Sequence, residues 1–311
     1  MATRKLTGLR PQAYEHPLDT KALDALTRTA GLDTLVTKLN AWGADRILRM
    51  QLTGSYFRVT PDSFPEVYSL FITARDRLDL PIMPEMYIVG SREINAFTSC
   101  VERPLIALTS GAIDLLTPDE LIFVIAHEMG HIKSGHVLYC QIADVILPVA
   151  GELVDSIPFM GLLVRTGLGG ALLHWKRMSE YTADRAGLLA CQNMHTALRT
   201  MTKLAGLPRK YFDSHNTEDF VQQARDFRAL EAEPGSMIAK FLATVGATHP
   251  WTVERAQQLL EWFDRGEYQA TLDDPRRRAL PSPNTAAACR GCGKPLRPGE
   301  RFCIYCGRPI A

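Results

Sequence analysis

The motif His127-Glu128-Met129-Gly130-His131 constrains this chain more than any other feature. It has the form H-E-x-x-H, whose first and last residues share a helix face because they lie just over one turn apart. Two imidazoles on one face can bind a single zinc ion, and the glutamate between them can take a proton from zinc-bound water. The motif therefore predicts a metal-dependent peptidase. The alternative is two ordinary histidines, one exposed and one hydrogen-bonded.

The residues before the motif predict a buried helix. Thr117 can cap a helix, Pro118 suits its first position and Glu120 completes a capping box. Residues 121–126 are apolar without a break, which is typical of a helix buried on all sides. Polar groups that emerge from such a helix must be hydrogen-bonded or bound to metal. This context favours the metal site.

A third metal ligand is expected because zinc in hydrolases takes three protein ligands and keeps one position open. The candidate is Glu180, on a second predicted helix. Asp184 lies four residues later on the same face and can orient a ligating histidine by accepting a hydrogen bond from its far nitrogen. The alternative is a solvated acidic pair beside the basic residues of this segment, Lys176, Arg177 and Arg185.

The order of these motifs resembles the gluzincin peptidases of the HtpX and CAAX prenyl endopeptidase type. The resemblance covers about residues 85–265. It rests on the following segments: His127-Glu128-x-x-His131, Glu180-x-x-x-Asp184, Asn95-Ala96-Phe97, Thr109-Ser110-Gly111, Leu115-Leu116, Glu120-Leu121, Thr248-His249-Pro250 and Glu254-Arg255.

The resemblance implies a role for each residue of the two main motifs. His127, His131 and Glu180 would bind the catalytic zinc. Asp184 would stand behind His127 and hold its ring. Glu128 would act as general base and then as general acid to the leaving amine.

The resemblance also implies contacts with the substrate. His249 would donate a hydrogen bond to the tetrahedral oxyanion, whereas a histidine before a proline at a helix start can simply cap backbone groups. Asn95, Ala96 and Phe97 would form the active-site edge strand that binds substrate. Main-chain pairing at such an edge would select extended peptides more than particular side chains.

Four of the seven cysteines form two C-x-x-C pairs, with ten residues between the pairs. This spacing predicts a zinc ribbon held by Cys289, Cys292, Cys303 and Cys306, whose folding depends on a structural zinc. Two disulfides are the alternative, which the absence of a secretory signal disfavours. We expect a reducing, cytoplasmic setting, with buried free thiols at Cys100, Cys140 and Cys191.

The 311 residues suffice for a sizeable core. We expect an α+β fold, mainly α, with a zincin-like core and a small three-stranded sheet beside the H-E-x-x-H helix. The predicted strands are residues 86–89, 94–99 and 105–109. Later helices are expected at 196–205, 217–232, 235–245 and 252–265, the last capped by Thr252. The predicted organisation is a helical layer at 1–84, the peptidase domain at 85–266, a linker at 267–288 and the zinc ribbon at 289–311.

The segment 136–175 is apolar and rich in glycine, but charges interrupt it. Its longest uncharged run is ten residues, about half of what a membrane span needs. We therefore expect an apolar helical insert that covers the cleft or meets a partner. Peripheral membrane contact stays open as an alternative, and with it a membrane-associated location.

The net charge of +1 gives no reason to expect nucleic acid as a partner. The sequence predicts a zinc metalloendopeptidase of the EC 3.4.24 type, with one catalytic and one structural zinc, which hydrolyses extended or misfolded proteins or peptides. A protein partner could bind the ribbon. The alternatives are a catalytically silent zinc-ribbon adaptor on a peptidase-like body and a zinc hydrolase of another class.

Overall fold

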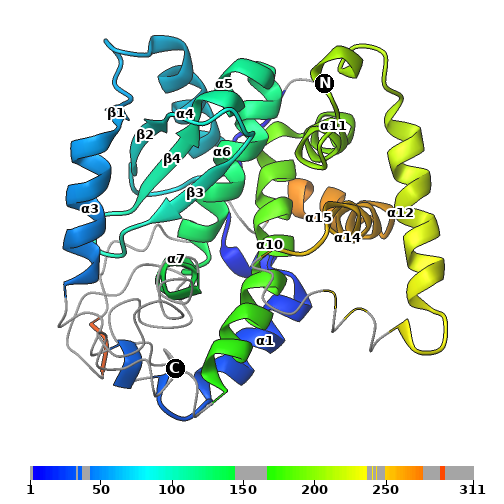
Figure 1. Cartoon of the computed structure of the whole chain (residues 1–311), viewed down its shortest axis with the longest axis horizontal. Helices are drawn as coiled ribbons and strands as arrows, with labels where there is room; N and C mark the ends of the chain where they lie inside the picture. The colour runs from blue at the N-terminus through cyan, green and yellow to red at the C-terminus, as the bar shows by residue number, and fades with distance from the viewer. Residues whose placement is uncertain are drawn as a thin grey trace.

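The structure is a computed structural model that describes residues 3–32, 34–36, 43–143, 167–236, 240, 243, 249–275 and 288–290. Within these ranges the chain is mainly helical, with one small sheet, so the predicted α+β class is confirmed. In Figure 1 the sheet and the C-terminal helices α12 and α14 lie on opposite sides of a central helix pair, α6 (Pro118–Lys133) and α10 (Leu168–Cys191).

The described N-terminal part consists mostly of helices. Its helices are η1 (Pro11–Ala13), α1 (Pro17–Thr27), α3 (Ala44–Ser55) and α4 (Pro65–Arg77). Helix α1 packs on α10, and α4 packs on α6. The segment therefore covers the central helix pair directly.

The sheet has four strands rather than the three predicted, in the order β1-β2-β4-β3. Strand β1 (Phe57–Arg58) pairs antiparallel with β2 (Glu85–Val89), which runs parallel to β4 (Leu105–Thr109). Strand β3 (Ala96–Ser99) pairs antiparallel with β4 and forms one edge. Two residues are too few to show the alternation that marks a strand, so β1 carried no sequence signal.

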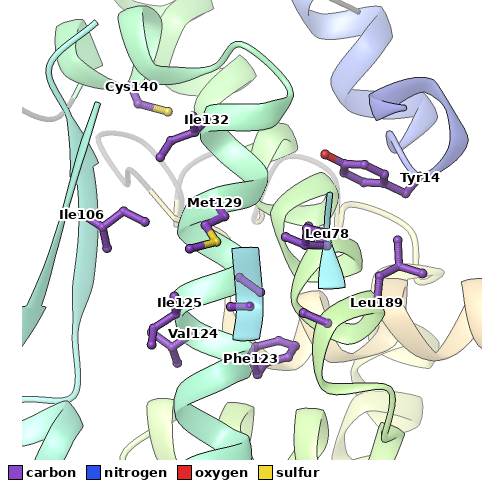
Figure 2. Packing of buried hydrophobic residues seen from close by; sticks show 14 of the residues in the cluster. Tyr14, Leu78, Ile106, Phe123, Val124, Ile125, Met129, Ile132, Cys140 and Leu189 are labelled. Atoms are coloured by element: carbon purple, nitrogen blue, oxygen red, sulfur yellow. The ribbon is translucent and has the colours of Figure 1, made fainter. Parts of the chain in front are cut away.

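Helix α6 is the centre of the hydrophobic core. The predicted capping box forms, because the Glu120 side chain accepts from Thr117 N while Thr117 Oγ1 accepts from Glu120 N. Every residue from Glu120 to Ile132 is buried. Figure 2 shows Ile106 of β4 on one side of α6 and Leu189 of α10 on the other. The helix that carries the motif is thus enclosed between the sheet and α10.

Short helices flank α6, and further helices follow α10 along the chain. Helix α5 (Ser110–Leu115) precedes α6, and α7 (Val137–Gln141) follows it. After α10 come α11 (Met194–Leu204), η3 (Arg209–Tyr211), α12 (Thr217–Glu231), α14 (Thr252–Asp264) and α15 (Glu267–Asp273). The helix predicted at 235–245 lies mostly outside the described residues.

Two expectations in this half are wrong. Trp251, not Thr252, is the N-cap of α14, and no side chain caps that helix. The linker does not start at residue 267, because α15 follows directly and buries Tyr268 against Trp262. A helix of seven residues is too short for its apolar spacing to stand out in a sequence.

Candidate metal centre

The close packing of α6 against α10 creates the site. Gly130 of α6 faces α10, where a Cβ atom at its position would lie only 2.7 Å from Cβ of Ala186 and 3.2 Å from Cα of Ala183. Gly187 of α10 similarly faces the ring of Phe123. These two glycines allow the helix axes to approach, so side chains from both helices meet at one point.

The two histidines of the motif and Glu180 meet there. Potential ligand atoms of His127, His131 and Glu180 all lie within 4.8 Å of one another, and all three side chains are buried. Nε2 of His127 is 3.3 Å from Oε2 of Glu180, and Nε2 of His131 is 3.4 Å from Oε1. Within the part of the chain that the structure describes, no other group of three or more histidine, cysteine or acidic side chains has this geometry.

The donor set suits a divalent metal. Two imidazole nitrogens and one carboxylate are ligands that zinc takes in catalytic centres, where a fourth position stays open. Oε1 of Glu180 is buried without a hydrogen-bond partner among the described residues, although the Lys176 ammonium lies 3.1 Å away. Burial alone would raise the pKa of Glu180, but Lys176 and the nearby histidines hold it well below its usual value. An ionised, incompletely bonded carboxylate between two imidazoles fits a metal ligand.

Asp184 and Arg255 form a layer behind His127. Oδ1 of Asp184 lies 3.0 Å from Nδ1 of His127, and Arg255 binds the same carboxylate through Nε at 2.8 Å and Nη2 at 2.6 Å. Burial alone would raise the pKa of Asp184, but Arg255 and His127 lower it. The ionised carboxylate accepts a hydrogen bond from Nδ1–H of His127, so Nε2, which faces Glu180, is the nitrogen that can bind a metal. In the sequence, Arg255 is marked only by its place after the Thr248-His249-Pro250 segment, and nothing local predicts its contact with Asp184.

Glu128 lies in the same buried turn of α6. Its backbone oxygen accepts a hydrogen bond from the Thr98 hydroxyl of β3 at 3.3 Å, which ties the turn to the sheet. Burial raises the pKa of its carboxyl group above the ordinary value. A carboxyl group with a raised pKa is a stronger base than an ordinary glutamate and can later return the proton that it accepts.

The remaining predicted residues lie at the rim. The His249 side chain is 52% exposed, with Nε2 3.9 Å from Oε1 of Glu180, so it reaches the centre from the solvent side. Ala96 and Phe97 belong to the edge strand β3, and Asn95 directly precedes it. Asn95 is tied to the neighbouring strand, because its backbone oxygen accepts from Thr109 N at 3.0 Å.

The cysteines divide as the sequence suggests within the described residues. Cys100, Cys140 and Cys191 are buried, as predicted, and Cys289 is buried as well. The other three residues of the predicted ribbon, Cys292, Cys303 and Cys306, lie outside the described residues.

The predicted insert 136–175 is described only at its two ends. Its first residues lead into α7, and its last residues already belong to α10, the same helix that carries Glu180. None of the helices that the structure describes combines the length and the apolar content needed to cross a bilayer.

Comparisons with known proteins agree with the resemblance seen in the motifs. A family model described as peptidase family M48 matches residues 62–263, and a model described as a zinc-ribbon domain matches residues 289–310. The second match confirms that the C-terminal segment belongs to a zinc-ribbon family, as the cysteine spacing predicted.

Several curated proteins are similar to this chain. The plastoglobule-localized metallopeptidase 48 of Arabidopsis thaliana is 28% identical over 268 residues, which cover 86% of this chain and 76% of that protein. A protease HtpX homolog of Salinibacter ruber is 29% identical over 224 residues, covering 65% of this chain and 76% of that protein. The protease HtpX homolog 2 of Methanosarcina acetivorans is 28% identical over 231 residues, with coverages of 67% and 75%. No solved structure matches the chain.

Proposed function

This chain belongs to peptidase family M48, and we propose that it is a zinc-dependent endopeptidase that cleaves extended or misfolded proteins. The family makes it a metallopeptidase whose substrates are proteins or peptides. We propose three further properties: cleavage within chains as an endopeptidase, membership of the EC 3.4.24 subclass, and a preference for unfolded substrates.

One observation carries the proposal: two imidazoles and a carboxylate converge from two tightly packed helices. His127, His131 and Glu180 would hold the catalytic zinc, and Asp184 would hold the ring of His127. Such a zinc supplies Lewis-acid polarisation of the scissile carbonyl and lowers the pKa of a water molecule toward neutrality.

Glu128 would then move the proton. Its buried carboxylate accepts a proton from the attacking water and returns it to the nitrogen of the leaving amine. The raised pKa of this group supports both halves of that transfer, because neither proton movement is then strongly uphill.

The rim residues would position the substrate. Strand β3 is an edge of the described sheet, so an extended peptide could pair with its main chain beside α6. Asn95, Ala96 and Phe97 would form that binding edge. His249, half exposed and 3.9 Å from Glu180, would donate to the oxyanion that forms when the carbonyl is attacked.

The zinc ribbon would bind a second, structural zinc through Cys289, Cys292, Cys303 and Cys306, and would recruit a partner or substrate. We further propose a cytoplasmic enzyme whose segment 136–175 covers the cleft or contacts a membrane surface. The proposed division is a helical layer at 1–84 and a catalytic domain at 85–266. We propose that the linker begins after α15, which is a helix with buried side chains.

The decisive experiment is the Glu128→Gln variant, assayed on casein and on a peptide library. Loss of a general base should lower the rate by about 100- to 10,000-fold while zinc content is kept. Glu66→Gln, at an exposed position of α4, is the matched control and should keep full activity. If purified wild-type protein binds zinc at this centre and cleaves nothing, the chain is a silent adaptor and the proposal is wrong.

A further inference from the structure

A second buried histidine stands directly behind metal-site residue His131. Nδ1 of His136 lies 3.1 Å from Nδ1 of His131, and both rings are almost fully buried. His136 immediately precedes α7, and its main chain is fixed by a hydrogen bond from its N to the backbone oxygen of His131 at 2.9 Å. The Trp175 ring packs edge-on against His136 with centroids 5.4 Å apart. His136 therefore has little freedom to turn away.

The far nitrogen of His136 meets a carboxylate from the N-terminal helix. Nε2 of His136 lies 3.2 Å from Oδ2 of Asp19, on α1. Asp19 is 2% exposed and also accepts hydrogen bonds from Trp175 Nε1 at 2.9 Å and from the Thr182 hydroxyl at 2.6 Å. The Thr182 oxygen already accepts the backbone N–H of His16, so its own proton is directed to Asp19.

These partners fix the direction of each hydrogen bond. The indole N–H of Trp175 can only donate, and the Thr182 hydroxyl donates as well, so both oxygens of Asp19 act as acceptors. His136 consequently presents its Nε2–H to Asp19. In its neutral form it then has a lone pair at Nδ1, which faces His131.

The same conclusion follows from the metal side. For Nε2 of His131 to bind a metal, the ring proton must sit on Nδ1. The nearer acceptor is Nδ1 of His136 at 3.1 Å, since the weakly accepting Sγ of Cys140 lies 3.9 Å away. Nδ1 of His136 can accept only while its own proton sits on Nε2, toward Asp19.

We propose that Asp19 and His136 are positioning residues that hold His131 in the metal-binding tautomer. This inference rests on the proposed zinc site. Each ligand histidine is then oriented by a carboxylate. Asp184 contacts His127 directly, and Asp19 acts on His131 through the ring of His136. Asp19 lies outside residues 62–263, so this support comes from beyond the part that the peptidase model matches. Docking of α1 on α10 then completes the metal site.

The test is the zinc affinity of Asp19→Asn, measured in the full chain by competition with a chromophoric chelator. In the orientation that keeps the Trp175 contact, the amide of the asparagine points its N–H toward His136. His136 then carries its proton on Nδ1, where it opposes the Nδ1 proton of His131. Zinc affinity should fall by about 10- to 100-fold, as for other residues that orient zinc ligands. Asp24→Asn, exposed on the same helix, is the control and should leave it unchanged.

A double-mutant cycle separates positioning from a merely structural role. His136→Asn offers an amide oxygen to His131 without needing Asp19, and it leaves the Trp175 and Thr182 contacts of Asp19 in place. If Asp19 acts through His136, adding Asp19→Asn to this variant should change zinc affinity by no more than about twofold, which is the usual scatter of such double-mutant measurements. Full additivity of the two losses would overturn the proposal.

Two further measurements distinguish an error in the proposed role of Asp19 and His136 from an error in the zinc site itself. Histidine ring ¹⁵N–¹H spectra of the metal-free protein should show the His136 proton on Nε2 in the wild type and on Nδ1 in Asp19→Asn. An unchanged tautomer would overturn the proposal that Asp19 acts on His131 through His136. Glu180→Gln should abolish zinc binding at this centre. If Glu180→Gln keeps full affinity, the proposed zinc site itself is wrong. If Glu180→Gln loses zinc affinity and Asp19→Asn keeps it, the zinc site stands and only the positioning role of Asp19 and His136 is wrong.

Discussion

Oδ1 of Asp184 lies 3.0 Å from Nδ1 of His127, on the side of the ring away from Nε2, which faces Glu180 3.3 Å away. One histidine thus connects a buried, ionised carboxylate to the metal site. The Asp184 carboxylate is itself bound by Arg255, so its position is fixed from two sides.

The first prediction concerns this contact. Asp184→Asn should lower zinc affinity by about 10- to 100-fold, because an amide can donate to Nδ1 of His127 and so favour a proton on Nε2. Competition with a chelator measures the change, and Asp264→Asn, exposed on α14, is the control. Unchanged affinity in Asp184→Asn would show that the carboxylate does not orient the ligand.

The second prediction concerns helix spacing. Gly130→Ala places a methyl group 2.7 Å from Cβ of Ala186, which forces α6 and α10 apart and should cost about 1–3 kcal/mol of unfolding free energy. Zinc affinity should fall with it, because the ligands are divided between the two helices. Denaturant unfolding and metal content measure both effects. Gly170→Ala has no atom within 4 Å of the new methyl group and should be neutral or stabilising.

The third prediction is the pH dependence of zinc binding. Burial alone would lower the pKa of His127, but hydrogen bonds to Asp184 and Glu180 outweigh it and raise the pKa to about 9. In the metal-free protein this ring is charged at neutral pH, so zinc must displace its proton. Apparent affinity should rise about tenfold per pH unit below pH 9 and level off above it. Calorimetry in buffers of different ionisation enthalpy should detect the released proton, and an affinity independent of pH would contradict the assignment.

The fourth prediction separates the two metals. Glu180→Gln should remove the catalytic zinc and leave the ribbon zinc, whereas Cys303→Ser should do the reverse. Elemental analysis of the purified variants against the wild type measures this directly. If either variant loses both metals or neither, the division into one catalytic and one structural zinc is wrong.

The sequence predicted the parts of the fold that rest on local signals. The start of α6 follows from Thr117, Pro118 and Glu120, whose bonding pattern is local and independent of the rest of the chain. The same applies to β4, a short β-branched and apolar run whose predicted ends are those observed. Glu180 stays a predicted ligand: a catalytic zinc needs a third protein ligand, and the structure brings this carboxylate within 4.8 Å of both histidines.

Contacts between distant segments had no such signal. Asp19 and His136 are separated by more than a hundred residues, and an aspartate in a helix is ordinarily a solvated residue. Tyr268 of α15 is buried where it packs against Trp262 and Phe263 of α14. These features depend on how helices pack, which neither composition nor periodicity encodes.

The most direct test of the central claim is a crystal of the full chain measured at the zinc absorption edge. The account predicts an anomalous peak about 2.0–2.2 Å from Nε2 of His127, Nε2 of His131 and a carboxylate oxygen of Glu180. A zinc-replete crystal with no peak between these three side chains would contradict it.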